Sequence, residues 1–244
     1  MNDGFVNEKE LREYINDKKF ATYNKNIKDF LTFLFGSCFN DSMSFVAQKV
    51  IGQVKPDLCI THNGQKKYVS IKKGSGNSVH QESIDVFFPY IKENFDEETL
   101  DNIKLFHYGD DTLNDTGILR YNANECKAKY VNEIKQLNSK FNLYDNLIKF
   151  LDRFLFVGNV GTLTVDAIYH GTIRSGLWAS REEIINYVAS TDFSSNSVHF
   201  GPMTYQVWGR NEKGIAVHPD RRYIMQVKWG SLLRDLTTIR EEND

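Results

Sequence analysis

The chain has 244 residues, of which 41% are hydrophobic and 13% aromatic. This composition excludes a disordered chain, and the length suits one large domain or a core with an added subdomain. No apolar run approaches the roughly 20 residues that span a bilayer. The opening residues, MNDGFVNEKELREY, lack the pattern of a signal peptide, so a cytoplasmic location is expected. The three widely spaced cysteines favour buried thiols over a disulfide framework or a structural zinc site.

Charge is unevenly distributed, although the formal net charge is only −2. Residues 49–73 hold six lysines against one acidic residue, and residues 205–240 hold seven basic residues against three acidic ones. Between these stretches, residues 82–115 hold ten acidic residues against two lysines. Two basic stretches could line a positive cleft for a nucleic acid, although each one alone would also suit a solvated surface of mixed charge.

Apolar periodicity predicts three helices in the first part of the chain. A capping-box pattern, Asn7 with Glu10, opens the first helix, which is expected to reach about Phe20. Apolar residues at helical spacing predict the second helix within 23–35 and the third within 41–52.

A β-hairpin is predicted next, around Asn63-Gly64. These two residues separate two strand-like runs, and both central residues of a type I′ turn need a positive φ, which Asn and Gly adopt readily. With this two-residue loop, Leu58 is expected to pair with Val69. The apolar residues of the two strands would then share one face.

The opposite face of the hairpin carries polar residues at its open end. Asp57 is expected opposite Ser70, and Lys72 lies two residues further on the same face. A carboxylate and an ammonium held side by side on rigid strands suit a catalytic site, and they would equally suit a plain cross-strand ion pair.

The remaining two thirds of the chain mix helices and strands. Helices are predicted from Ser78, with Gln81 as its capping partner, and over 124–138, 140–154, 180–188 and 231–239. Strands are predicted over 102–109, 162–170, 203–208 and 223–229.

Glu82 would lie in the first two turns of the helix that begins near Ser78. The glycine-containing loop GSGNS precedes that helix, and it could fold the helix start back towards Asp57. Two carboxylates would hold a divalent cation through their oxygens, while Lys72 would orient or help to activate a water polarised by the metal. Phosphodiester hydrolysis is the chemistry that needs these parts.

Pro56-Asp57, followed after the hairpin by Ser70-Ile71-Lys72, resembles the motif of the PD-(D/E)XK nuclease superfamily, which includes most type II restriction endonucleases. The resemblance covers roughly residues 40–110. It implies an α/β fold with an αβββαβ core, in which helices flank a mixed central sheet, and an added mixed α+β recognition region at the C-terminal end.

The sequence departs from this family's pattern at Ser70, where Asp or Glu is usual. A subset of restriction enzymes similarly carries Ser-x-Lys and takes the missing carboxylate from the next helix, which is the part expected of Glu82. The resemblance implies Asp57, Ser70, Lys72 and Glu82 as catalytic residues. It also implies a Mg²⁺ site formed by Asp57, Glu82 and the main-chain carbonyl of Ile71.

The resemblance and the charge pattern together predict a Mg²⁺-dependent type II restriction endonuclease of a restriction-modification system. Such a hydrolase cleaves phosphodiester bonds of double-stranded DNA at a specific sequence, and a symmetric site would imply a homodimer. No membrane and no nucleotide cofactor is expected. The alternatives are a less specific repair or recombination nuclease and a DNA-binding module whose nuclease site has decayed, with Ser70 as the trace.

The nuclease core is expected over 1–158, and the recognition region over 159–244 or continuous with the core. Arg, Gln and Asn read base edges, whereas Lys and Arg hold phosphates. On that basis the residues expected to contact DNA are Lys73, Arg174, Arg181, Gln206, Arg210, Asn211, Arg221, Arg222 and Lys228.

Overall fold

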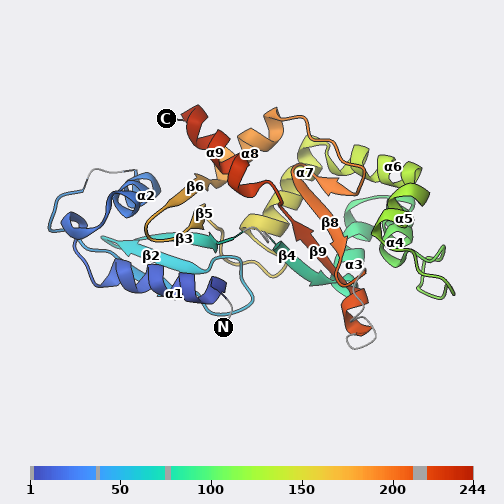
Figure 1. The fold of residues 1–244 in the computed structure, drawn as a ribbon, viewed down its shortest axis with the longest axis horizontal. Coiled ribbons are helices and arrows are strands. Elements are labelled where there is room, and N and C mark those ends of the chain that lie inside the picture. Colours follow the sequence, from blue (N-terminus) through green and yellow to red (C-terminus); the bar gives the residue numbers. More distant parts are fainter. Residues whose placement is uncertain (1–2, 37–38, 75–77, 211–218, 244) are drawn as a thin grey trace. The chain divides into compact units, whose positions relative to one another are not determined.

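The structure, a computed structural model, describes residues 3–36, 39–74, 78–210 and 219–243. The chain divides into two compact units, each built from separate segments (Figure 1). Unit 1 comprises residues 1–77, 151–191 and 231–244, and unit 2 comprises residues 78–150 and 192–230. The boundary expected at residue 158 falls inside unit 1, because this unit takes segments from both sides of it. Within the described ranges, no helix is both long and apolar enough to cross a membrane.

A mixed five-stranded sheet forms the centre of unit 1, in the order β1-β2-β3-β5-β6. Its strands are β1 (Val46–Lys49), β2 (Leu58–His62), β3 (Gln65–Lys72), β5 (Ala167–Gly171) and β6 (Gly176–Ser180). β3 and β5 run parallel, and every other neighbouring pair is antiparallel. The helices of this unit are α1 (Asp3–Asn16), α2 (Lys25–Phe35), α8 (Arg181–Ser190) and α9 (Leu232–Asn243), with short helical turns at Phe20–Thr22 and Asp152–Phe156.

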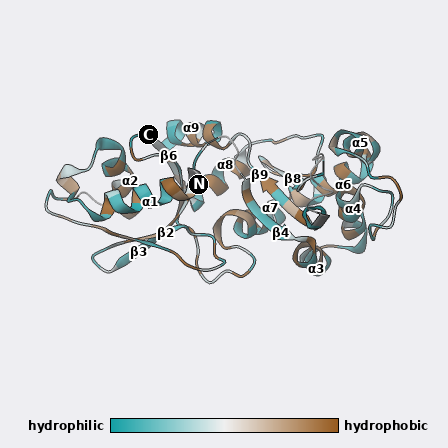
Figure 2. Ribbon diagram, turned by 60° about the horizontal axis from the view of Figure 1, so that its bottom comes forward, coloured by the Kyte–Doolittle hydropathy of each residue, from teal (hydrophilic) through white to brown (hydrophobic). Residues whose placement is uncertain are grey.

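Helices flank this sheet and bury its apolar side chains. α1 packs against β1 and β3, whereas α2, α8 and α9 pack against β6. Leu11 and Ile15 of α1 and Ile27 and Phe30 of α2 join Val69 of the sheet in one buried cluster. Figure 2 shows both hydrophilic and hydrophobic residues along α1, as expected for a helix with one buried side.

The predicted second helix is confirmed as α2. Ile27, Phe30, Leu31 and Leu34 are buried on it, and Asn24 caps it by accepting a hydrogen bond from the backbone N–H of Ile27. The capping box expected at Asn7 is wrong, because α1 begins at Asp3 and Asn7 lies within it. The Asn7 side chain instead donates to the carbonyl of Gly171 at 2.8 Å.

The helix predicted within 41–52 is also wrong, because this segment contains strand β1. β1 pairs antiparallel with β2, so its backbone groups are satisfied across the sheet. The Asn16 side chain fixes the strand further: it accepts from the N–H of Ala47 at 2.8 Å and donates to the carbonyl of Ala47 at 2.9 Å. Tertiary pairing therefore outweighs a periodicity that short segments satisfy easily.

The predicted hairpin is confirmed in both turn and register. Asn63 and Gly64 have φ values of 47° and 80°, as a type I′ turn requires. β2 and β3 pair with Leu58 opposite Val69 and His62 opposite Gln65. The apolar face of the hairpin is consequently buried in the core of unit 1.

Unit 2 contains an antiparallel four-stranded sheet in the order β4-β9-β8-β7. Its strands are β4 (Ser78–Ser83), β9 (Ile224–Lys228), β8 (Met203–Val207) and β7 (His199–Phe200). The helices that follow β4 are α3 (Ile84–Asn94), α4 (Glu97–Tyr108), α5 (Ala123–Lys129), α6 (Val131–Phe141) and α7 (Tyr144–Leu151). α3 packs against β4 and β9, and a short turn at Pro219–Tyr223 leads into β9.

Two further predictions are wrong in unit 2. The segment from Ser78 is a strand, and the helix begins only after Ser83, whose hydroxyl caps it. Residues 102–108 belong to helix α4, which Asp96 caps at its start and which ends at Gly109, with a φ of 61°. In each case the capping residues that flank the helix decide where it begins or ends. Two helices were predicted over 124–138 and 140–154, but this stretch forms three, α5, α6 and α7. The helix over 180–188 and the strands over 203–208 and 223–229 are confirmed with shifted ends.

His107 is fully buried in unit 2 and neutral in the fold. Its Nε2–H donates to the carbonyl of Arg222 at 2.8 Å, and its Nδ1 accepts from the Tyr205 hydroxyl at 2.6 Å. Burial is the main cause that lowers the pKa of His107 to about 3, and the neighbouring Arg210 lowers it further. Because protonation is harder in the folded state, stability is complete above a pH of about 6.5 and declines as the pH falls towards 3.

We expect His107→Gln to remove this pH dependence. The variant should be less stable at pH 8, because hydrogen bonds are lost, but the difference from the wild type should narrow by about 2 kcal/mol on lowering the pH to 5. Denaturant unfolding at several pH values measures this. Parallel stability curves for the two proteins would contradict a neutral buried His107.

Candidate active site

The polar residues predicted at the open end of the hairpin lie together in unit 1. The Asp57 carboxylate accepts a hydrogen bond from the Ser70 hydroxyl at 3.1 Å and from the backbone N–H of Ile71 at 2.6 Å. The backbone N–H of Asp57 donates to the carbonyl of Val69 at 2.9 Å. Asp57 is therefore fixed to the last residues of β3 by both its backbone and its side chain.

Lys72 lies on the same side of the hairpin as Asp57. Its Nζ is 3.9 Å from Asp57 Oδ2, at the outer limit of an ion pair, and the two side chains are 23% and 26% exposed. Ser70, between them, is buried. Both charged groups thus remain partly open to solvent, while the hydroxyl that positions Asp57 is not.

A second carboxylate approaches this cluster from α1. Glu8 is half-buried, and burial is the main cause that raises its pKa above the ordinary value. The Asp57 carboxylate raises the pKa of Glu8 further, whereas Lys49 and Lys72 lower it. Glu8 therefore lies within electrostatic range of Asp57, Lys49 and Lys72, and the Glu8 and Asp57 carboxylates repel each other.

The oxygen atoms at this site suit a hard divalent cation. Mg²⁺ binds in proteins through one or two carboxylates and keeps its remaining positions for water and substrate phosphate. Glu8 and Asp57 supply two carboxylates, and the pKa of Glu8 is raised first by burial and then by the charge of Asp57. Among the described residues no group of three or more His, Cys, Asp or Glu side chains could hold a metal, so a site here would need such additional oxygen ligands.

Comparison with solved structures identifies the fold that carries this site. The structure matches restriction endonuclease MspI, in a crystal structure of that enzyme with its cognate DNA, with a TM-score of 0.61 and 14% sequence identity. The match covers 92% of this chain and 88% of that one. The chain has a restriction-endonuclease-like fold. No protein-family model and no curated protein matches the sequence.

Within this restriction-endonuclease-like fold, Glu82 occupies a different environment from the one predicted. It lies on strand β4 of unit 2, not in a helix, and its side chain is buried on the sheet face that also carries His80. Glu82 Oε1 is 3.2 Å from His80 Nε2. The strand alternation that buries Glu82 also turns Gln81 to the exposed face.

Three of the arginines predicted to contact DNA have intramolecular partners. Arg181 makes two hydrogen bonds to Asp152, both at 2.9 Å. Arg210 donates to the carbonyls of Phe106 and His107 at the end of α4. Arg222 pairs with Asp115. These contacts give each guanidinium a structural role in its own unit.

The other predicted DNA contacts are distributed over both units. Lys73 and Arg174 are exposed in unit 1, after β3 and between β5 and β6. Gln206 is exposed on β8 of unit 2 and Lys228 is half-buried on β9. The guanidinium of Arg221 lies 4.7 Å from the centre of the Trp208 ring. Asn211 lies outside the described residues.

The repulsion between Glu8 and Asp57 can be measured directly. We expect Asp57→Asn to lower the pKa of Glu8, because it removes a like charge, and Lys72→Met to raise it, because it removes an opposite charge. Carboxyl-carbon NMR titration would report both shifts. Lys66→Met, which removes an exposed lysine from the other end of the hairpin, is the matched control and should leave the Glu8 titration unchanged. An unchanged pKa of Glu8 in Asp57→Asn would contradict the proximity of the two carboxylates.

Proposed function

We propose that the chain is a Mg²⁺-dependent deoxyribonuclease of the PD-(D/E)XK superfamily that hydrolyses phosphodiester bonds of double-stranded DNA. One observation carries the proposal: the Asp57 carboxylate, held by Ser70 and Ile71, lies beside Lys72 at the end of β3, and Glu8 of α1 interacts electrostatically with both. The restriction-endonuclease-like fold of the chain supports it.

In this proposal Glu8 takes the part that the sequence assigned to Glu82. Glu8, Asp57 and the main-chain carbonyl of Ile71 would hold Mg²⁺. Bound Mg²⁺ would supply positive charge against the scissile phosphate and lower the pKa of a coordinated water. Glu8 and Asp57 also exclude other anions from the site until the cation offsets their charge.

Lys72 and Ser70 have separate roles. The Lys72 ammonium is partly exposed and near Asp57, so it can donate to a phosphate oxygen of the substrate and stabilise the charge that develops during hydrolysis. Ser70 acts through Asp57 as a positioning residue, because its hydroxyl donates to the carboxylate and is itself buried. Ser70 at this position is therefore compatible with an active site.

The finer assignment is a type II restriction endonuclease of a restriction-modification system, which cuts both strands at a specific symmetric sequence. Two sites related by symmetry would be needed for that product, which argues for a homodimer. Lys73 and Arg174 are exposed on unit 1 and are the proposed phosphate contacts there. A less specific repair nuclease would use the same chemistry without discrete fragments.

We expect Asp57→Asn, Glu8→Gln and Lys72→Ala each to reduce Mg²⁺-dependent cleavage of a plasmid by at least about 100-fold, the lower range for losing one catalytic group. The first two should also weaken metal binding, measured by titration calorimetry, whereas Lys72→Ala should spare it. Single-turnover cleavage over a Mg²⁺ titration gives the rates.

Lys66→Ala and Glu82→Gln are the comparisons for this series. Lys66→Ala removes an exposed positive charge on the same hairpin and should cleave at the wild-type rate. If Glu8→Gln cleaves at the wild-type rate while Glu82→Gln loses cleavage, Glu82 and not Glu8 supplies the second carboxylate. An inactive wild type that still binds DNA would mean a decayed nuclease, and fragments without discrete lengths would mean a repair-type enzyme.

A further inference from the structure

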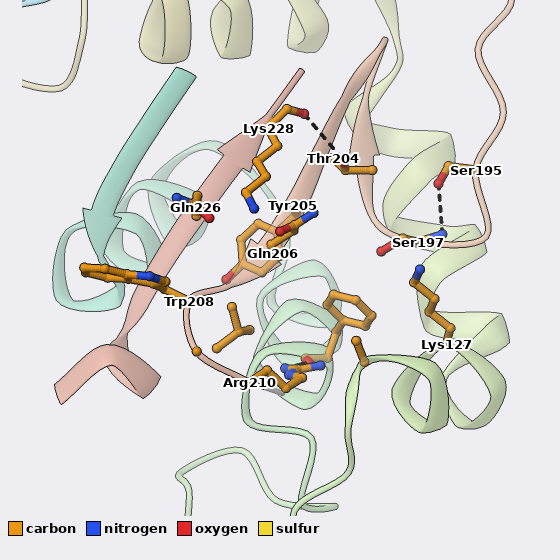
Figure 3. Close-up of a pocket in the computed structure, with 14 residues that line it drawn as sticks. Lys127, Ser195, Ser197, Thr204, Tyr205, Gln206, Trp208, Arg210, Gln226 and Lys228 are labelled. Atoms are coloured by element: carbon orange, nitrogen blue, oxygen red, sulfur yellow. Dashed lines mark hydrogen bonds between the residues drawn. The ribbon is translucent and has the colours of Figure 1, made fainter. Parts of the chain in front are cut away.

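Unit 2 contains a pocket of about 310 Å³ along strand β8 (Figure 3). β8 and the turn after it form one wall over residues 204–210, and α5 contributes Ala123 and Lys127. Ser195 and Ser197, which precede β7, also line the pocket. The volume is at the lower end of the roughly 300–1,000 Å³ typical of small-molecule sites, so the pocket suits one compact ligand.

The backbone of β8 presents hydrogen-bonding groups along this pocket. Trp208 N donates to Ile224 O at 3.0 Å, and Gln206 pairs with Gln226, so even-numbered residues direct their backbone groups to β9. The backbone groups of Tyr205 and Val207 therefore point away from β9.

The neighbouring strand on that side is too short to use these groups. β7 has two residues and pairs only with Met203 and Thr204, and the Tyr205 N–H donates to the carbonyl of Val198 at 2.9 Å. The Tyr205 carbonyl and the Val207 N–H come next along the edge, and no described residue supplies them with a partner. This edge thus offers one acceptor and one donor, separated by a single residue.

Positive charge surrounds the pocket. Its lining includes Lys127, Lys228 and Arg210 and no carboxylate from the described residues. Figure 3 shows Lys127 on α5 and Lys228 on β9, on either side of β8. Arg210 is already bonded to the end of α4, whereas neither lysine amine forms an ion pair with a described residue. The pocket therefore favours a ligand that carries negative charge.

Aromatic side chains complete the lining. Phe106 and Trp208 both contribute to it. Phe106 is only 3% exposed and the Arg210 guanidinium lies 5.2 Å from its ring centre, whereas the guanidinium of Arg221 lies over the Trp208 ring at 4.7 Å. Trp208 is therefore the ring on which a planar heterocycle would stack, on the face opposite Arg221. Hydroxyl and amide groups of Ser197 and Gln206 add further polar contacts.

We propose that this pocket binds a single nucleotide. The edge of its base would accept from the Val207 N–H and donate to the Tyr205 carbonyl, because each base carries a donor and an acceptor side by side on its pairing edge. Lys127 and Lys228 would hold the phosphate. The bound nucleotide could come from two sources that share this chemistry: a free nucleotide, or a nucleotide extruded from DNA. Only the second source rests on the proposed nuclease function.

Isothermal titration calorimetry with each of the four nucleoside 5′-monophosphates, in the presence of a metal chelator, tests the pocket. We expect saturable one-to-one binding of at least one of them, weakened about tenfold or more by Lys127→Met or Lys228→Met, since each removes a charged hydrogen bond. Lys135→Met removes an exposed lysine from α6 of the same unit and should change nothing. Thermal unfolding confirms that each variant folds.

Val207→Pro separates the base contact from the phosphate contact. Proline removes the backbone N–H and is tolerated where an edge strand does not use that group. We expect this variant to bind the monophosphate about tenfold more weakly and to bind inorganic phosphate like the wild type, whereas Lys127→Met should weaken both. Equal binding of the monophosphate by Val207→Pro and the wild type would overturn the assigned base contact.

Duplexes with one mismatched 2-aminopurine distinguish the two sources, because its fluorescence rises when the base leaves the stack and mismatched bases are the easiest to extrude. A rise with the wild type and Lys135→Met, but not with Lys127→Met, would assign the pocket to an extruded nucleotide. Binding of monophosphates without any rise would assign it to a free nucleotide. If neither occurs while the wild type still cleaves DNA, this inference is overturned and the proposed nuclease stands.

Discussion

The hydrogen bonds of the Asp57 carboxylate hold the candidate active site together. A carboxylate that accepts from the Ser70 hydroxyl and the Ile71 N–H cannot rotate freely, so the start of β2 and the end of β3 share one fixed acidic group. The same register turns Lys72 to the side of Asp57 and buries Val69 and Ile71 on the other face. Hairpin, core and site therefore depend on one alignment, and a slip of one residue would invert them all.

Glu8 adds a constraint of the opposite sign. Packing of α1 brings a second negative charge towards Asp57, and both burial and that charge raise the pKa of Glu8. The burial of Leu11 and Ile15 of the same helix in the core stabilises the fold and offsets this repulsion. A pKa raised by burial and by a neighbouring carboxylate is typical of a functional site, and it supports the proposed role of these two carboxylates.

The hairpin could be predicted from the sequence because its signal is local. Asn63-Gly64 sets the turn, and the turn sets which residues face Asp57. The segments 41–52 and 102–109 could not be assigned in the same way, since short apolar runs satisfy both helical and strand periods until pairing or capping decides. Strand β1 depends on β2 and on Asn16, and helix α4 depends on Asp96 and Gly109.

Glu8 was missed for a similar reason. Its neighbour Asn7 lies on the same helical stripe as Leu11 and Ile15, four residues apart. A polar residue in such a stripe was the signal in the sequence that this part of the helix contacts something other than an apolar core. Glu82 was expected in its place because Ser70 stands where the motif usually has Asp or Glu, and a subset of restriction enzymes takes the missing carboxylate from the helix after the hairpin. Strand alternation in β4 instead turns Glu82 to the buried face of unit 2.

The central claim is that Glu8 and Asp57 form one cation site. Crystals soaked in Mn²⁺, measured at a wavelength where manganese scatters anomalously, test it most directly. We predict an anomalous peak about 2.0–2.3 Å from a carboxylate oxygen of Asp57 and within reach of Glu8, the range for Mg²⁺-like ions in oxygen sites. The peak should disappear in Asp57→Asn. A manganese peak at Glu82, or none between Glu8 and Asp57, would contradict the account.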